Sequence, residues 1–413
     1  MLVVRNARVA TMNGPQGAPG DAPLGLLEDA AVAIEAGNIR WVGPDRDAPE
    51  GETLDAEGAL VTPGFVEPHT HLIFGGDRAG EHAQRLAGES YLAIARRGGG
   101  IAATVRATRA TSDEVLVRGA RARLERLARA GVTTVEVKSG YGLSVAEELR
   151  LLRLIAEASR GASCEVVPTL LGLHAVPPEG DRASWVRAVE TELVPEAARL
   201  GLARGCDAFC EEGAFTHAEC RSVLEAAGRA GLTLHLHADQ LTAGGGAELA
   251  ASLGCGSADH LERTSAAGRL ALARAGTTAV LLPLAAWFLR DAHPAQAAPF
   301  LEAGATVALG GNLNPGSQRL ESVSLLLAAG CLIAGLTPAQ ALWACTAGGA
   351  RALRLSDRGR IAPGLRADLV IHATRDPAHL PYHAGVEHAV VVLRGGTIVH
   401  DARASRATLG CDS

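Results

Sequence analysis

A short apolar run followed by a segment with helical spacing recurs eight times through the middle of this 413-residue chain, and this alternation restricts the fold more than any other feature. Residues 144–158 and 217–230, rich in Ala, Leu and Arg, are typical of the helical segments. Alternating strands and helices favour parallel βα units, and eight such units close into a barrel. We therefore predict an α/β fold whose main part, residues 63–355, is a (β/α)8 TIM-like barrel. The eight apolar runs end near Pro68, Val137, Leu170, Cys210, His237, Asp259, Leu282 and Leu309.

Both ends of the chain differ from the middle, because short β-type runs alternate there with turn residues. Residues 31–43 read as a hairpin with a Gly-Asn turn, and residues 367–371 and 389–393 read as strands. A barrel of roughly 250 residues leaves room for a smaller domain in a chain of this length. We predict one small β-sheet domain that the two termini build together, from residues 1–62 and 356–413.

Charge and hydropathy exclude two classes of partner. The formal net charge is −6 and no basic block occurs, so we expect no nucleic-acid partner. Residues 322–350 carry no charge, but a helix stop and a new helix start at 335–338 favour two buried helices over a membrane span. The N-terminus lacks a long apolar run and the eight cysteines form no CxxC pair, which indicates a cytoplasmic protein with free thiols.

Polar side chains that can perform chemistry follow the apolar runs with few exceptions. Catalytic groups of such barrels gather at the carboxyl ends of the strands, so we expect one site at that mouth. In chain order, these residues are His69, His71, Lys138, Tyr141, His174, Glu211, Glu212, His237, Gln240, His260 and Asn312.

Three histidines form a candidate metal site. His69 and His71 are two residues apart, so both imidazoles point the same way from an extended segment. His237, at the fifth strand, would complete a set of neutral imidazoles of the kind that binds zinc or iron. His235 lies within the fifth strand, and we expect it in the core. His260, after the sixth strand, is the candidate for polarising a carbonyl oxygen.

These histidines, taken together with the eighth-strand position 312, resemble the ligand set of the amidohydrolase superfamily, and residues 359–370 resemble its return to the small sheet. Within that superfamily the chain is similar to the imidazolonepropionase family over nearly its whole length. The resemblance implies hydrolysis of 4-imidazolone-5-propanoate to N-formimidoyl-L-glutamate in histidine degradation, one zinc or iron ion, and a homodimer. The segments that carry it are 68–78, 98–101, 137–142, 173–178 and 314–316.

The resemblance also implies the residues that contact the substrate. Arg78 matches the residue that holds the propanoate carboxylate, a role that suits the planar guanidinium fork. The other matched substrate positions are Tyr141, His174, Gln240, Asn314, Gly316 and Ser317. Lys138 is the chain's single lysine and has no role in the resemblance; it either hydrogen-bonds to the Tyr141 loop or is structural.

One position departs from the family. The eighth strand of imidazolonepropionases ends in an aspartate that ligates the metal and shuttles a proton, whereas this chain has Asn312. An amide can offer a neutral oxygen to a metal but cannot accept a proton. The substitution either inactivates the enzyme or marks a natural variant with altered chemistry. Two other functions stay open: a related amidohydrolase or deaminase acting on another small ring, and a ligand-binding homologue without turnover, which Asn312 alone supports.

Overall fold

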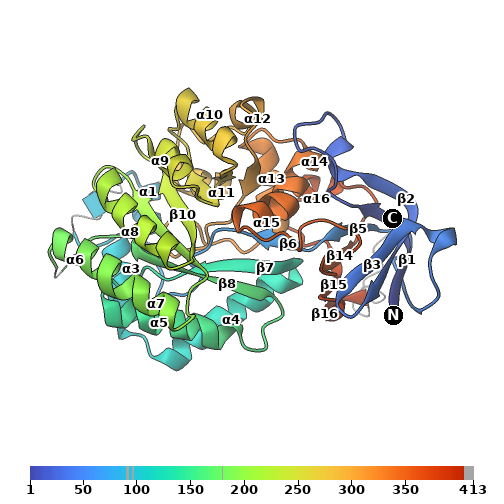
Figure 1. Cartoon of the computed structure of the whole chain (residues 1–413), viewed down its shortest axis with the longest axis horizontal. Helices are drawn as coiled ribbons and strands as arrows, with labels where there is room; N and C mark the ends of the chain where they lie inside the picture. Colours follow the sequence, from blue (N-terminus) through green and yellow to red (C-terminus); the bar gives the residue numbers. More distant parts are fainter. Residues whose placement is uncertain (90–92, 95–96, 179, 404–413) are drawn as a thin grey trace.

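The computed structural model describes residues 1–89, 93–94, 97–178 and 180–403. Its central element is a sheet of eight parallel strands in the order β13-β12-β11-β10-β9-β8-β7-β6, curved into a barrel (Figure 1). The predicted α/β barrel is confirmed. The strands are β6 (Phe65–Glu67), β7 (Val132–Lys138), β8 (Glu165–Leu173), β9 (Gly205–Cys210), β10 (Thr233–Ala238), β11 (Ser257–His260), β12 (Thr278–Leu281) and β13 (Val307–Leu309).

The strand ends lie within one residue of the predicted ones in seven cases. The exception is β8, which continues past Leu170 to Leu173. Its pairing with β9 changes register between these two residues, so three more residues extend toward the mouth and bring His174 with them. Such an irregularity re-aims the side chains that follow it.

Backbone hydrogen bonds beyond the ends of β6 and β13 close the barrel at its mouth. The Asn312 N–H donates to the His69 carbonyl at 2.9 Å, and the His71 N–H donates to the Leu313 carbonyl at 3.0 Å. The Glu67 carboxylate accepts a hydrogen bond from the Gly311 N–H at 2.9 Å across the same seam. The first and eighth strand ends therefore lie side by side, which places His69 next to Asn312.

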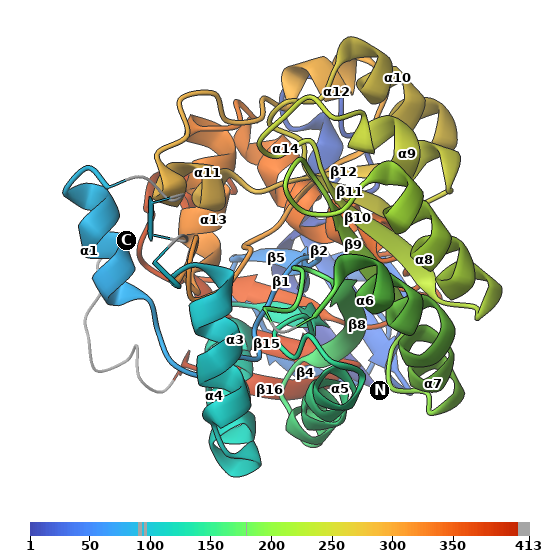
Figure 2. The ribbon, with the colours of Figure 1, turned by 90° about the vertical axis from the view of Figure 1, so that its left-hand side faces the viewer.

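Helices surround the barrel strands (Figure 2). Two of them begin at the predicted positions, where the Ser144 side chain caps one helix and Thr216 forms a capping box with Glu219 at the other. The helices between the strands are α1 (Ala79–Leu86), α3 (Ile101–Ala110), α4 (Asp113–Arg129), α5 (Val145–Ser159), α6 (Arg182–Ala188), α7 (Val194–Arg199), α8 (His217–Arg229), α9 (Gly246–Ser252), α10 (Ala266–Ala275), α11 (Pro283–Leu289) and α12 (Ala298–Glu302).

Both termini contribute to a second sheet, as predicted, with the order β16-β15-β14-β5-β1-β2-β3 and β4 beside β1 (Figure 1). The two contributions meet where β14 pairs antiparallel with β5. The hairpin turn lies on Ala36 and Gly37, not on the expected Gly-Asn pair, and both residues have positive φ, 49° and 83°. The strands are β1 (Leu2–Ala10), β2 (Leu26–Glu35), β3 (Asn38–Pro44), β4 (Glu52–Asp55), β5 (Leu60–Pro63), β14 (Leu369–His372), β15 (Ala389–Arg394) and β16 (Thr397–Asp401).

The uncharged segment 322–350 forms separate helices, which are α13 (Val323–Leu332), α14 (Pro338–Trp343) and α15 (Gly349–Ala352). Thr337 caps α14 in a capping box with Gln340, so the break falls where the sequence predicts it. Within the described ranges no helix is both long and apolar enough to cross a membrane. The seven described cysteines are free thiols, and Cys411 lies outside the described residues.

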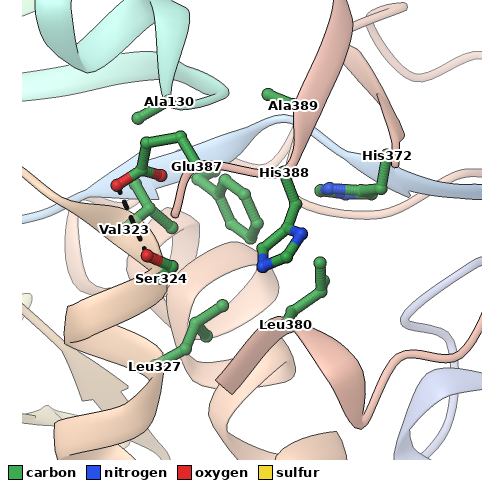
Figure 3. A pocket seen from close by; sticks show the side chains of 10 residues that line it. Ala130, Val323, Ser324, Leu327, His372, Leu380, Glu387, His388 and Ala389 are labelled. Carbon is green, nitrogen blue, oxygen red and sulfur yellow. Dashed lines mark hydrogen bonds between the residues drawn. The ribbon is translucent and has the colours of Figure 1, made fainter. Parts of the chain in front are cut away.

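A small cavity lies where the terminal sheet and the short helix α16 (His379–Tyr382) meet the barrel (Figure 3). His372 and His388 line it together with Glu387, Ser324 and apolar side chains. His372 is buried, and its Nε2 lies 2.8 Å from the Thr62 hydroxyl. The cavity has a volume of about 10 Å³, room for about one water molecule, so it is too small to be a substrate site.

Candidate active site at the barrel mouth

Three buried imidazoles, from His69, His71 and His237, converge at the mouth of the barrel. One ring nitrogen of each lies within 4.8 Å of the others. His69 and His71 extend from β6, and His237 lies on β10, so the chain reaches this point from opposite sides of the barrel. The Nε2 atoms of His71 and His237 are 3.4 Å apart. The structure therefore brings together the three residues predicted as metal ligands.

Two aspartates orient two of these rings from behind. His69 Nδ1 lies 2.5 Å from Asp259 Oδ2, and His237 Nδ1 lies 3.0 Å from Asp207 Oδ2. Both carboxylates are fully buried. The Asp259 carboxylate accepts the Nδ1 proton of His69 and so leaves the lone pair on Nε2, the arrangement usual for metal-binding histidines, whereas Asp207 and His237 Nδ1 lie at an ion-pair distance.

The site fits a cation that prefers imidazole. His69 Nε2 is buried and has no hydrogen-bond partner among the described residues. Burial lowers the pKa of all three histidines, so their rings are neutral and can act as ligands. Nitrogens bound at 2.0–2.1 Å around a tetrahedral zinc lie about 3.3 Å apart, close to the His71–His237 separation.

Lys138 lies beneath the histidines and joins the carboxylates behind them. Its Nζ is 2.9 Å from Glu136 Oε1, 2.8 Å from Asp207 Oδ2 and 4.0 Å from Asp259 Oδ2, and the side chain is fully buried. Burial opposes its charge, but Asp207, Glu136 and Asp259 together raise the pKa of Lys138 above its usual value. The lysine is therefore a buried counter-ion of these carboxylates, and its ammonium contacts within the described part of the chain are with them.

A different residue orders the Tyr141 loop. The buried Glu148 carboxylate accepts hydrogen bonds from the backbone N–H groups of Gly140, Gly142 and Leu143, at 2.8, 2.7 and 2.8 Å. Helix α5 thus holds the loop through one side chain, which the sequence did not single out. Tyr141 is placed 5.9 Å from the His71 ring, centroid to centroid.

His174, which follows the third strand, covers the His71 imidazole. Its ring stacks on His71 with centroids 4.9 Å apart and planes 19° apart. His174 Nδ1 lies 2.8 Å from the Gly140 carbonyl oxygen, so Nδ1 carries the proton and donates. Burial lowers the pKa of His174 to about 4. The neutral ring therefore presents an accepting Nε2, next to Tyr141.

His260 joins the cluster from β11, with its ring 5.5 Å from that of His237 and 5.9 Å from that of His69. His260 and Leu261 both have positive φ, 81° and 72°. Side chains other than glycine rarely adopt this conformation, and such strain is concentrated at functional sites. The strained backbone turns the His260 ring toward the other imidazoles.

Asn312 is buried beside His69 and also has positive φ, 53°. The Asn314 amide N–H₂ donates to the Asn312 carbonyl at 2.7 Å and to the Asn312 side-chain oxygen at 3.2 Å. Asn314 Oδ1 accepts from the N–H groups of Gly316 and Ser317, both at 2.8 Å. Asn314 is thus the centre of the 312–317 loop, and its amide is used within the loop.

Arg78 lies against that loop. A Cβ atom on Gly316 would fall 1.9 Å from Arg78 Nη1, so only glycine lets the guanidinium lie there. Arg78 Nε donates to Glu81 Oε2 at 2.8 Å, and the Arg78 side chain is 8% exposed. An incoming carboxylate would share this guanidinium with Glu81. The structure therefore places Arg78 against the loop that Asn314 orders through Gly316 and Ser317.

Gln240 follows β10 and is partly exposed. Glu211 supports its loop, because its buried carboxylate accepts hydrogen bonds from the Leu241 N–H at 2.8 Å and from the Thr242 hydroxyl. His235 packs in the core with Nδ1 2.9 Å from the Ser257 hydroxyl, as expected. The sequence did not identify Asp207; its only signal was a carboxylate inside an otherwise apolar strand.

Comparison with known proteins agrees with this geometry. Residues 60–400 match the amidohydrolase family model. The chain is 54% identical to an imidazolonepropionase of Anaeromyxobacter dehalogenans, covering 99% of this chain and 98% of the relative. It is 48% identical to one of Myxococcus xanthus, covering 96% of each.

Solved structures share the fold at low identity. An adenosine deaminase from Xanthomonas campestris with bound zinc superposes with a TM-score of 0.74 at 21% identity, over 97% of this chain and 93% of that one. A 5-methylcytosine deaminase from Klebsiella pneumoniae gives 0.72 at 17% identity, over 97% of each chain.

Proposed function

Because this chain belongs to the imidazolonepropionase family of amidohydrolases, we propose that its barrel mouth hydrolyses 4-imidazolone-5-propanoate to N-formimidoyl-L-glutamate. The observation that carries the proposal is the buried cluster of His69, His71 and His237, in a chain that matches the family from end to end. In the reaction a water oxygen joins the ring carbonyl carbon, the carbonyl C–N bond breaks, and the ring nitrogen takes a proton.

The family depends on a metal, and we propose that His69, His71 and His237 hold one zinc or iron ion, with the Asn312 side-chain oxygen as a further neutral ligand. Support comes from the neutral imidazoles, the unpartnered His69 Nε2 and the 3.4 Å nitrogen separation. Such an ion lowers the pKa of a water molecule and polarises a carbonyl. Metal analysis of the purified protein decides between zinc and iron.

The protein side chains supply recognition and proton transfer. Arg78 binds the propanoate carboxylate with a guanidinium fork, which fixes the ring relative to the histidines. His260 donates a hydrogen bond to the carbonyl oxygen as negative charge develops there. Tyr141, His174 and Gln240 contact the ring, and the 314–317 loop contacts the substrate's acidic end. The neutral His174 imidazole can accept a hydrogen bond from an N–H group of the substrate ring.

Asn312 sets the expected rate. An aspartate at this position can take a proton from the attacking water and return one to the leaving nitrogen, and an amide can do neither. We therefore propose slow turnover. The test is to incubate metal-loaded protein with 4-imidazolone-5-propanoate and to follow loss of the ring and formation of N-formimidoyl-glutamate. Cytosine and adenosine, assayed for ammonia release, test the deaminase alternative. Tight substrate binding without any product would favour the ligand-binding homologue.

The homodimer and the cytoplasmic location expected from the sequence stay predictions. Size-exclusion chromatography with light scattering measures the first directly.

A further inference from the structure

A second opening lies at the end of the barrel opposite to the histidines. It is a cleft of about 430 Å³, within the range of small-molecule sites. Thr278, the first residue of β12, and Thr306, which precedes β13, form its floor. These strands carry their carboxyl ends to the catalytic mouth, so the cleft and the mouth are separated by the length of the barrel. Helix α15 and the segment that returns to the terminal sheet form its walls.

Four arginines line this cleft, namely Arg351, Arg354, Arg358 and Arg360. Carboxylates neutralise one of them: Arg358 pairs with Asp357 at 2.9 Å and with Glu165 at 3.1 Å. For the other three, no carboxylate oxygen of the described residues lies within the 4.0 Å of an ion pair. The cleft therefore holds unbalanced positive charge in a chain whose formal net charge is −6.

The hydrogen bonds that these arginines make within the protein use only some of their guanidinium N–H groups, so the other N–H groups can donate to a ligand. Arg354 Nη2 donates to the Cys255 carbonyl at 3.0 Å, and Arg351 Nη1 donates to the Thr306 hydroxyl at 3.3 Å. Arg351 also lies over the Trp343 ring, 5.0 Å from its centroid, which holds its guanidinium in place. Burial, and then the positive charge of Arg360, lower the pKa of Arg351. Like charges are thus held near one another, and an anion between them would relieve the repulsion.

We propose that this cleft binds a small polyvalent anion, a metabolite-sized molecule bearing phosphate or carboxylate groups. Guanidinium groups bind both kinds of oxyanion in a fork, and more than one positive charge favours a ligand with at least two negative charges. The hydroxyls of Thr306 and Ser356 add hydrogen-bonding groups, while Leu355 offers an apolar surface for the rest of the molecule. The bound anion would link the barrel to the segment that returns to the terminal sheet.

The experiment uses metal-loaded protein and two probes, inorganic phosphate and succinate, titrated calorimetrically at constant ionic strength so that screening stays fixed. We expect saturable binding of at least one probe, and the stronger probe identifies the anion class. Arg351→Gln and Arg360→Gln should each weaken it about tenfold or more, because each removes a charge-assisted contact. Arg360→Gln is the safer variant, since the Arg360 side chain is exposed and no protein hydrogen bond to it occurs among the described residues.

Two matched variants locate the binding. Arg229→Gln removes an exposed arginine at the end of α8 that does not line the cleft, and should leave the affinity unchanged. Ser356→Glu places a carboxylate in the cleft and should abolish binding. The inference is overturned if neither probe binds at up to about 20 mM, or if the affinity survives both cleft variants and is lost in Arg78→Met, which would place the anion at the catalytic mouth. The anion affinity is measured without turnover, so a failure of this inference can be distinguished from a failure of the proposed hydrolysis.

Discussion

Lys138 Nζ lies 2.8 Å from Asp207 Oδ2, and Asp207 in turn lies 3.0 Å from the Nδ1 atom of His237. The second, fourth and fifth strands of the barrel are thereby joined through one buried ammonium. The same ammonium is 4.0 Å from Asp259, whose carboxylate holds His69. A single positive charge thus balances the carboxylates that orient two of the three clustered imidazoles.

Replacing that lysine should destabilise the protein strongly. Lys138→Met leaves Glu136 and Asp207 buried without their counter-ion, a loss that typically costs about 3–5 kcal/mol. We expect a decrease of this size in the free energy of unfolding of the metal-free protein, measured by denaturant titration. Arg129→Met, which removes a largely exposed ion pair with Glu125, should cost less than about 1 kcal/mol. Equal effects of the two variants would contradict the role of Lys138 as a counter-ion.

Arg78 should control substrate affinity and not metal content. Losing a charge-assisted fork costs on the order of 1.5–3 kcal/mol. Arg78→Met should therefore weaken substrate binding by roughly tenfold to a hundredfold. Arg78→Lys keeps the charge but loses the fork, so its substrate affinity should lie between that of the unmodified protein and that of Arg78→Met. Binding is measured by calorimetry and metal by elemental analysis. An unchanged affinity in Arg78→Met would show that another residue binds the carboxylate.

Asn312→Asp should raise the rate of hydrolysis. The aspartate restores a group that accepts and returns a proton, and general acid–base catalysis contributes about 10²–10⁴-fold. We expect kcat to rise by at least roughly a hundredfold. The comparison requires equal, measured metal occupancy, because the added negative charge also strengthens cation binding. Equal rates would mean that a different group, such as His260, already acts as base and that this chain is a natural variant.

His372, remote from the mouth, makes stability depend on pH. Burial, and then the charge of His388, lower its pKa to about 3, against 6.5 when exposed. The folded protein therefore binds fewer protons than the unfolded chain between these values, and stability falls as pH decreases through that window. This residue alone should lower the free energy of unfolding by about 2 kcal/mol between pH 8 and pH 5. His372→Gln should remove that share of the slope, whereas an unchanged slope would contradict the assignment.

Much of this architecture can be read from the sequence because apolar runs and the polar residues after them mark strand ends directly. The positions of His69, His71 and His237 follow from that rule alone. Asp207 does not, because its contact with His237 depends on the register between β9 and β10, in which His237 pairs with Phe209. The predicted hairpin turn lies one residue too far along the chain, because a positive φ is uncommon for alanine and the sequence gives no sign of it at Ala36.

The pairing of β5 with β14 has a consequence for synthesis of the chain on the ribosome. Residues 61–63 emerge early, but their partners at 369–371 emerge only after the entire barrel. Until then one edge of the N-terminal sheet exposes unpaired backbone groups beside apolar side chains, a condition that favours pairing with other chains. Premature termination before residue 369 should therefore yield aggregated product even when every barrel strand has been made.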